Sequence, residues 1–190
     1  MPADWAFWAE WTATSLAVIY VVLAARPSVW AWPFGIASSA VSVALFASTQ
    51  LYSEAWLNAA YVVLGFVGWF SWNGSADDQP ISQGPLRVHA IGAVVCVSGG
   101  LGWGLMMDHA TDASWPYIDA QTMWFSLFAT WLTARKWMEN WLYWVVIDLV
   151  SCVMYEAKGL HVYALLMAGY TVTAAVAWFR WRRQLKAIEA

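Results

Sequence analysis

Charged residues are scarce in this chain of 190 residues, because Asp, Glu, Lys and Arg together make up only 11%. A soluble domain carries about 25% charged residues, so too few are present to cover a globule in water. The net charge is −3, so the charge balance does not indicate the basic surface that binds nucleic acid. The only cysteines, Cys96 and Cys152, lie inside apolar stretches, which argues against a disulfide framework. These absences exclude a soluble globule and a disulfide-stapled fold.

Catalytic and metal-binding patterns are also missing. The three histidines, His89, His109 and His161, do not have the spacing of metal ligands, so we expect neither a metal nor a cofactor. Neither a Ser–His pair nor a double-aspartate motif of an intramembrane protease stands out, and residues 160–178 lack the lysine of a retinal protein. The N-terminus lacks the positive segment of a cleavable signal. We therefore expect a membrane protein that is not an enzyme and that retains its first apolar segment.

Apolar sequence is abundant: 62% of the residues are hydrophobic and 17 are tryptophan, a residue that favours the headgroup layer of a bilayer. A helix needs about 20 apolar residues to cross the hydrocarbon core. Seven such segments lie between the polar breaks: 5–25, 29–49, 52–72, 85–107, 116–134, 137–157 and 160–181. The predicted fold class is an all-α membrane protein with seven transmembrane helices.

The basic residues test this division. With seven crossings, eight of the nine cations fall on one side, and Lys158 alone falls on the other. The eight are Arg26, Arg87, Arg135, Lys136, Arg180, Arg182, Arg183 and Lys186. The positive-inside rule predicts such an asymmetry, so we expect the N-terminus outside and the C-terminus inside.

An internal repeat appears when the chain is shifted by 109 residues. Trp32 then aligns with Trp141 and Trp72 with Trp181, with 13 identities in 41 positions and no gap. Chance matching of Ala, Val and Leu is the competing interpretation. The shift of 109 residues moves the chain by four helices. Because four is an even number of membrane crossings, the two copies have the same orientation in the membrane. The sequence predicts 3+1+3 parallel repeats in one domain, 1–190: helices within 5–72, a linker at 85–107, and helices within 116–181.

The best candidate for a binding group is Asp148, near the centre of the sixth segment. A carboxylate there costs about 2.5–3.5 kcal/mol, and such residues normally face a cavity or a partner. Trp141, Trp144 and Ser151 recur on its helix face. Two indoles and a carboxylate form a surface for a flat cationic ring. The alternative is that both tryptophans lie at the membrane interface and that Asp148 bonds to a neighbouring helix.

Other polar residues are candidates for the same site, which we expect between the two copies near mid-membrane. They are Ser39, which is the repeat mate of Asp148, Asn58, Tyr61, Thr122 and Ser126. Each of them alone is also explained by a helix-packing hydrogen bond.

These motifs resemble the PnuC family of vitamin transporters, across about residues 30–181. The similar stretches are 32–35, 51–52, 57–61, 68–72, 119–120, Thr122, Ser126, 134–141, Trp144 and 158–160. The resemblance implies uptake of nicotinamide riboside, or of thiamine or another B vitamin, across a bacterial cytoplasmic membrane. It also implies a SWEET-like fold, a homotrimer surrounded by lipid, and facilitated diffusion with trapping by a cytoplasmic kinase.

Two positions depart from the family pattern. The riboside transporters have W-x-x-W-x-x-x-N in the sixth helix and L-Q-x-x-Y in the third. Trp141 and Trp144 match, whereas Asp148 replaces the asparagine and Asn58 the glutamine. Nicotinamide riboside and thiamine both carry a cationic ring nitrogen, so the choice between them stays open. Proton-coupled transport is the alternative mechanism, because a buried carboxylate can carry a proton.

Overall fold

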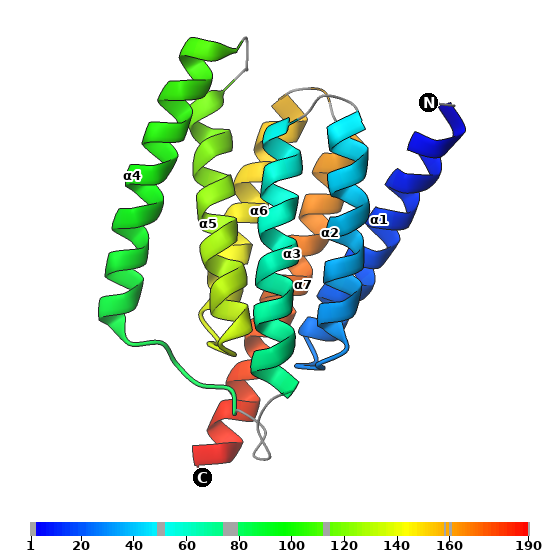
Figure 1. Ribbon diagram of the computed structural model, residues 1–190. Helices are drawn as coiled ribbons and strands as arrows, with labels where there is room; N and C mark the ends of the chain where they lie inside the picture. Colours follow the sequence, from blue (N-terminus) through cyan, green and yellow to red (C-terminus); the bar gives the residue numbers. More distant parts are fainter. Residues whose placement is uncertain are drawn as a thin grey trace. The chain divides into compact units, whose positions relative to one another are not determined.

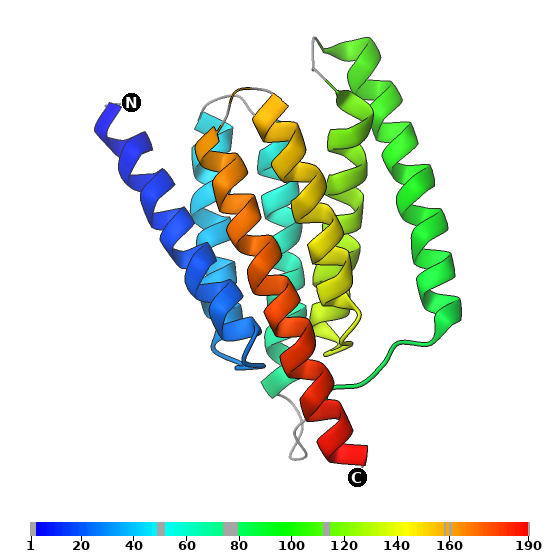
Figure 2. The same cartoon turned by 180° about the vertical axis from the view of Figure 1, so that it is seen from behind.

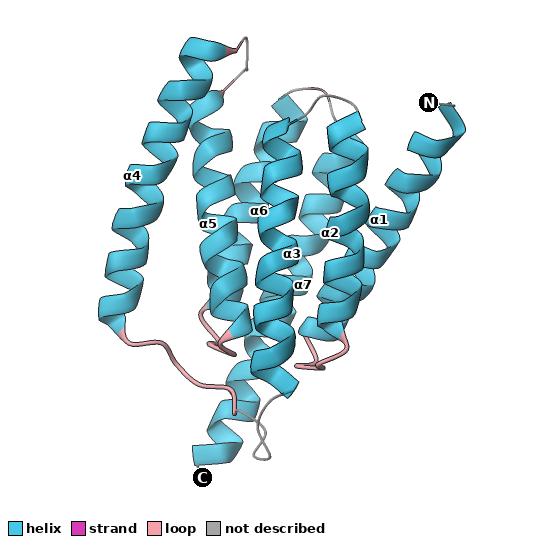
Figure 3. Ribbon diagram, in the orientation of Figure 1, coloured by secondary structure: helices cyan, strands magenta, loops and turns pink. Residues whose placement is uncertain are grey.

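The computed structural model describes residues 3–48, 52–73, 80–111, 115–157, 159 and 161–189, and within these it contains seven α-helices. Figure 3 shows helix as the dominant structure, with loops and turns only between helices. The helices are α1 (Ala3–Ala24), α2 (Ala31–Ser48), α3 (Tyr52–Asn73), α4 (Leu86–Ala110), α5 (Pro116–Ala134), α6 (Asn140–Ala157) and α7 (His161–Glu189). Each corresponds to one of the seven predicted segments.

Three predicted bounds were wrong by three residues or more, and one of them is the end of α4, at Ala110 rather than at 107. Helix α6 begins at Asn140 rather than at Trp137, because the amide of Met138 donates to the carbonyl of Ser82 at 3.0 Å. This contact holds residues 137–139 in a turn against the chain that precedes α4. Helix α7 ends at Glu189 rather than at 181. Hydropathy falls after residue 181, but Arg, Gln, Lys, Ala and Glu are good helix formers and continue the helix.

The chain forms two compact units. The first comprises Met1–Pro80 together with Ala134–Lys136, and the second comprises Ile81–Thr133 with Trp137–Ala190. Helices α1, α2 and α3 therefore belong to the first unit. Helix α4, expected as a linker, packs in the second unit with α5, α6 and α7.

In the first unit, α2 packs against both α1 and α3, and the three helices lie side by side in Figure 1. The Ser38 hydroxyl donates to the carbonyl of Ala13 at 2.8 Å, which joins α2 to α1. The indole of Trp32 lies against Gly68 of α3, where an added Cβ would be 2.3 Å from ring atoms. Only glycine allows so close an approach of this fully buried ring.

The end of α3 is fixed to the turn after α5. The indole nitrogen of Trp72 donates to the carbonyl of Ala134 at 3.1 Å. The ammonium nitrogen of Lys136 lies 5.1 Å from the centroid of the same indole, and the Lys136 side chain is only 5% exposed. A cation over an indole face is electrostatically attractive, more strongly so when water is excluded. This lysine, counted above among the basic residues of one side, is therefore a packed residue.

In the second unit, α4 packs on α5 through buried glycines, and Figure 2 shows the two helices side by side. A Cβ at Gly100 or Gly104 would be within 3 Å of the side chains of Gln121 or Tyr117. The small size of these two glycines therefore allows α4 and α5 to pack closely. Gly102, between them, has no heavy atom near its Cβ position.

Among the described residues, four helices are long and apolar enough to cross a membrane. Their spans are Trp5–Ala24, Ala31–Ser48, Ala55–Asn73 and Leu86–Ala110. Many large apolar side chains on α1, α3, α4, α6 and α7 are exposed, as expected for surfaces that face lipid. Several buried polar residues lie on α5 and α6 and lower the hydropathy of these two helices: Ser126, Thr130, Thr133, Asn140, Asp148 and Ser151.

Candidate functional site

Helix α6 buries its polar face and exposes its apolar face, the opposite of a surface helix in a soluble protein. Its buried residues are Asn140, Trp141, Ile147, Asp148, Ser151 and Met154, and its exposed apolar residues include Leu142, Val146, Leu149, Val150 and Val153. This distribution follows from the 3.6-residue period, which places Trp141, Asp148 and Ser151 on one side. From Leu142 to Val153 the exposed side is aliphatic.

Asp148 is 6% exposed, although it is a potential anion within a helix of apolar neighbours. No described residue of the second unit donates a hydrogen bond to its carboxylate. Tyr170 of α7 is near enough to interact with it electrostatically. Burial of a carboxylate is costly unless a partner compensates it, so this group has unused capacity to bind a cation or a hydrogen-bond donor.

The two tryptophans of the predicted triad differ in exposure. Trp141 is 3% exposed and makes a T-shaped contact with Trp181, at 5.6 Å between centroids and 83° between planes. Its indole nitrogen has no hydrogen-bond partner among the described residues. Trp144, one turn later, is half-buried. Trp141 is therefore a buried, packed residue and not an exposed tryptophan of the membrane interface. Part of the Trp144 ring remains exposed.

Thr122 and Ser126, the predicted contributions of α5, bond within their own helix. The Thr122 hydroxyl donates to the carbonyl of Asp119 at 2.8 Å, and the Ser126 hydroxyl donates to the carbonyl of Thr122. Each hydroxyl proton is thus engaged, which leaves lone pairs as acceptors. These residues can accept a hydrogen bond from a ligand but are poorly placed to donate one.

The other three predicted residues belong to the first unit. Ser39 of α2 is buried, while Asn58 and Tyr61 of α3 are half-buried and both interact with other groups. Tyr20 of α1 interacts electrostatically with Tyr61. Sequence reasoning missed Tyr20, which has no partner motif, and left Tyr170 out of the set. The repeat offset pointed to Tyr170 as the mate of Tyr61.

The two units share an internal feature at positions 109 residues apart. In the first unit Trp32 meets Trp72 at 5.2 Å and 87°; in the second Trp141 meets Trp181 at 5.6 Å and 83°. The polar positions differ, since Ser39 of the first unit stands where the second has Asp148. The tryptophan packing is thus similar in the two units, but only the second has a carboxylate at this position.

Among the described residues, no group of three His, Cys, Asp or Glu side chains is arranged to hold a metal ion. The chemistry available at α6 is non-covalent: a carboxylate for a positive charge or a hydrogen-bond donor, and an indole face for a flat ring.

Comparison with known proteins gives a consistent result. The family model described as nicotinamide mononucleotide transporter matches residues 7–183. The chain is 23% identical over 186 residues to the nicotinamide riboside transporter PnuC of Escherichia coli K12, covering 83% of this chain and 78% of that protein. It is 25% identical over 194 residues to the riboflavin/roseoflavin transporter RibM of Streptomyces davaonensis, covering 95% and 89%.

A solved structure has a similar fold. The crystal structure of the vitamin B3 transporter PnuC superimposes with a TM-score of 0.73 at 20% identity, covering 95% of this chain and 83% of that one.

Proposed function

This chain belongs to the nicotinamide mononucleotide transporter family, and we propose that it carries nicotinamide riboside across a membrane by facilitated diffusion. Family and fold make it a PnuC-type vitamin transporter, a multi-pass membrane protein and not an enzyme.

One observation carries the choice of substrate. Asp148 is buried, without a hydrogen-bond donor among the described residues of its unit, one turn from the half-exposed ring of Trp144. A flat ring with a fixed positive charge satisfies both groups: it stacks on the indole and neutralises the carboxylate. The pyridinium ring of nicotinamide riboside has this chemistry.

Thiamine is the second candidate, because its thiazolium ring is also cationic and its aminopyrimidine can donate hydrogen bonds to a carboxylate. The relative RibM is named for riboflavin and roseoflavin. Riboflavin has a neutral ring system, so a buried carboxylate offers it no charge complement. Asp148 therefore favours a cationic vitamin over a flavin for this chain.

The proposed architecture has two three-helix repeats, within 5–72 and 116–181, joined by a helix at 85–107 in one transmembrane domain. The matched T-shaped tryptophan pairs support it. The distribution of cations supports an external N-terminus and an internal C-terminus in a bacterial cytoplasmic membrane. A homotrimer, and trapping of the substrate by a cytoplasmic kinase, are proposed from the family resemblance.

A transport assay tests this function. Purified full-length protein in liposomes is given labelled nicotinamide riboside, thiamine or riboflavin, with no ion gradient. We expect the riboside to equilibrate to the external concentration, faster than in protein-free liposomes, and riboflavin to enter no faster than in that control.

Two results would contradict the proposal in different ways. Accumulation above the external concentration, only under an imposed proton gradient, would establish proton coupling, for which Asp148 is the candidate carrier. Entry of riboflavin, with exclusion of both cationic vitamins, would reject the substrate class.

A further inference from the structure

Helix α7 is longer than a membrane crossing requires. It spans 29 residues, about 44 Å at 1.5 Å per residue, whereas the hydrocarbon core is about 30 Å thick. The excess lies at its C-terminal end, where four cations occur within seven residues: Arg180, Arg182, Arg183 and Lys186. All four side chains are exposed. A rigid basic helix thus continues beyond the apolar part of α7.

Five exposed residues of α7 form a stripe along the helix. Val172, Val176, Phe179, Arg183 and Lys186 recur at alternating steps of four and three residues, which is one face of a helix. The apolar members of this stripe are between 52 and 64% exposed. The face that meets acyl chains therefore becomes basic at its C-terminal end without any change of direction.

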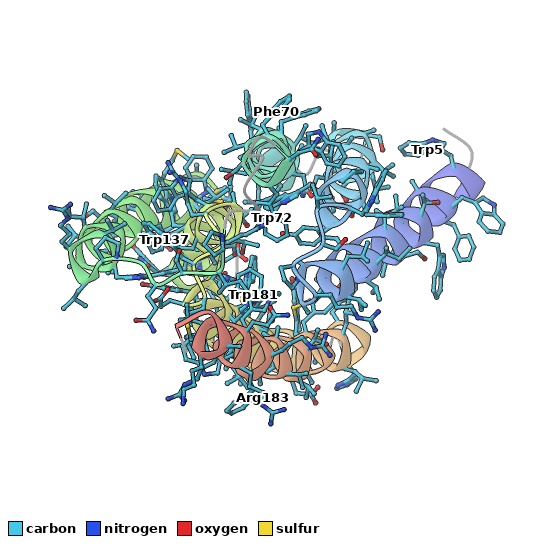
Figure 4. All side chains as sticks on the ribbon, turned by 90° about the horizontal axis from the view of Figure 1, so that it is seen from below. Trp5, Phe70, Trp72, Trp137, Trp181 and Arg183 are labelled. Carbon is cyan, nitrogen blue, oxygen red and sulfur yellow. The ribbon has the colours of Figure 1, made fainter. Side chains whose placement is uncertain are left out.

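The opposite face of α7 is the packed one. Ala174, Ala177, Trp181 and Leu185 are all buried, so packing of α7 in its unit continues to residue 185. Figure 4 shows Arg183 on the outer side of α7, opposite Trp181. Packing thus fixes the rotation of the helix and holds the basic side chains outward.

The positions of the basic residues along the axis of α7 indicate what they bind. Arg183 lies about 6 Å and Lys186 about 10 Å beyond Phe179 along the axis. Each headgroup layer is about 5–8 Å thick, by difference between the core and the whole bilayer. The cations begin where lipid phosphates lie, on the face already directed at lipid. We propose that Arg183 and Lys186 form a binding surface for the headgroups of anionic phospholipids.

An acidic protein is the other occupant that a basic surface could attract. Continuity with the lipid-facing stripe favours the membrane, because a protein partner would have to enter the headgroup layer. Each basic side chain near an anionic surface strengthens binding about fivefold, and the effect weakens with salt.

Native mass spectrometry of the purified full-length protein tests the proposal. The protein is offered equal concentrations of phosphatidylglycerol and phosphatidylcholine. We expect preferential retention of phosphatidylglycerol, reduced at least fivefold in the double variant Arg183→Gln/Lys186→Gln. The charge-preserving variant Arg183→Lys/Lys186→Arg should retain the preference within about twofold.

The matched control is Arg26→Gln/Arg87→Gln, which removes two exposed cations from outside α7. It should change the lipid preference by less than twofold. Equal losses in the two double-Gln variants, or no preference in the unaltered protein, would overturn the proposal. Retention of a polyglutamate peptide without retention of phosphatidylglycerol would assign the surface to an acidic protein instead. Melting temperatures in detergent establish that every variant is folded.

Discussion

Replacement of Asp148 by asparagine separates charge recognition from packing at the α6 site. The two side chains have almost the same shape, so the packing around a residue that is 6% exposed is preserved. The carboxylate is lost, together with its attraction for a cationic ring. Binding of cationic vitamins should therefore weaken while binding of neutral ones is unchanged.

The magnitude follows from Coulomb's law. Two unit charges about 5 Å apart, at an effective dielectric constant of about 20, attract by about 3 kcal/mol. The asparagine oxygen still accepts a hydrogen bond and restores part of this energy. A net loss of about 1.4–2.8 kcal/mol corresponds to a Kd for nicotinamide riboside that is about 10–100-fold higher.

Titration calorimetry in detergent measures this change, with riboflavin as the neutral comparison. Glu156→Gln is the matched control, since it removes an exposed carboxylate from the same helix. This carboxylate pairs with the exposed His161. The melting temperature of Asp148→Asn should not fall, because a buried charge is removed. Unchanged affinity for the riboside, or the same loss for Glu156→Gln, would refute the assignment of Asp148.

Two further predictions concern packing. Gly68→Ala forces a Cβ to 2.3 Å from the Trp32 ring and should lower stability by about 1–3 kcal/mol, whereas Gly169→Ala, in open space, should be neutral or stabilising. Equal melting temperatures for the two variants would contradict the close contact. Lys136→Gln should lower the melting temperature by a few degrees through loss of the cation–π contact with Trp72, while Lys136→Arg retains most of it. Indistinguishable unfolding curves for these two would show that the contact contributes nothing.

The helices were largely predictable because apolar length and periodicity are local properties of a sequence. The bounds of the helices were less predictable where contacts with distant segments decide where a helix begins. Trp137 looks like the start of an apolar helix, yet the contact between Ser82 and Met138 holds that stretch in a turn. At the other end, Arg182 and its neighbours end the hydropathy signal but not the helix.

The role of α4 also depended on packing. The sequence predicted a linker helix, but it did not name α5 as the neighbour or place α4 in the second unit. The hydroxyls of Thr122 and Ser126 illustrate the same limit. The sequence allowed a ligand contact or a helix hydrogen bond for each, and in the structure both protons are bonded to carbonyls of α5.

The sequence by itself determined a membrane protein with seven helices and a carboxylate on the aromatic face of α6, because helical periodicity fixes which residues share a side. Only the tertiary structure decided that Trp141 is packed against Trp181 while Trp144 keeps exposed ring surface. Both indoles have the same chemistry and lie on the same helix. Their difference comes from a residue 40 positions further along the chain, and such a contact is set by how the helices pack.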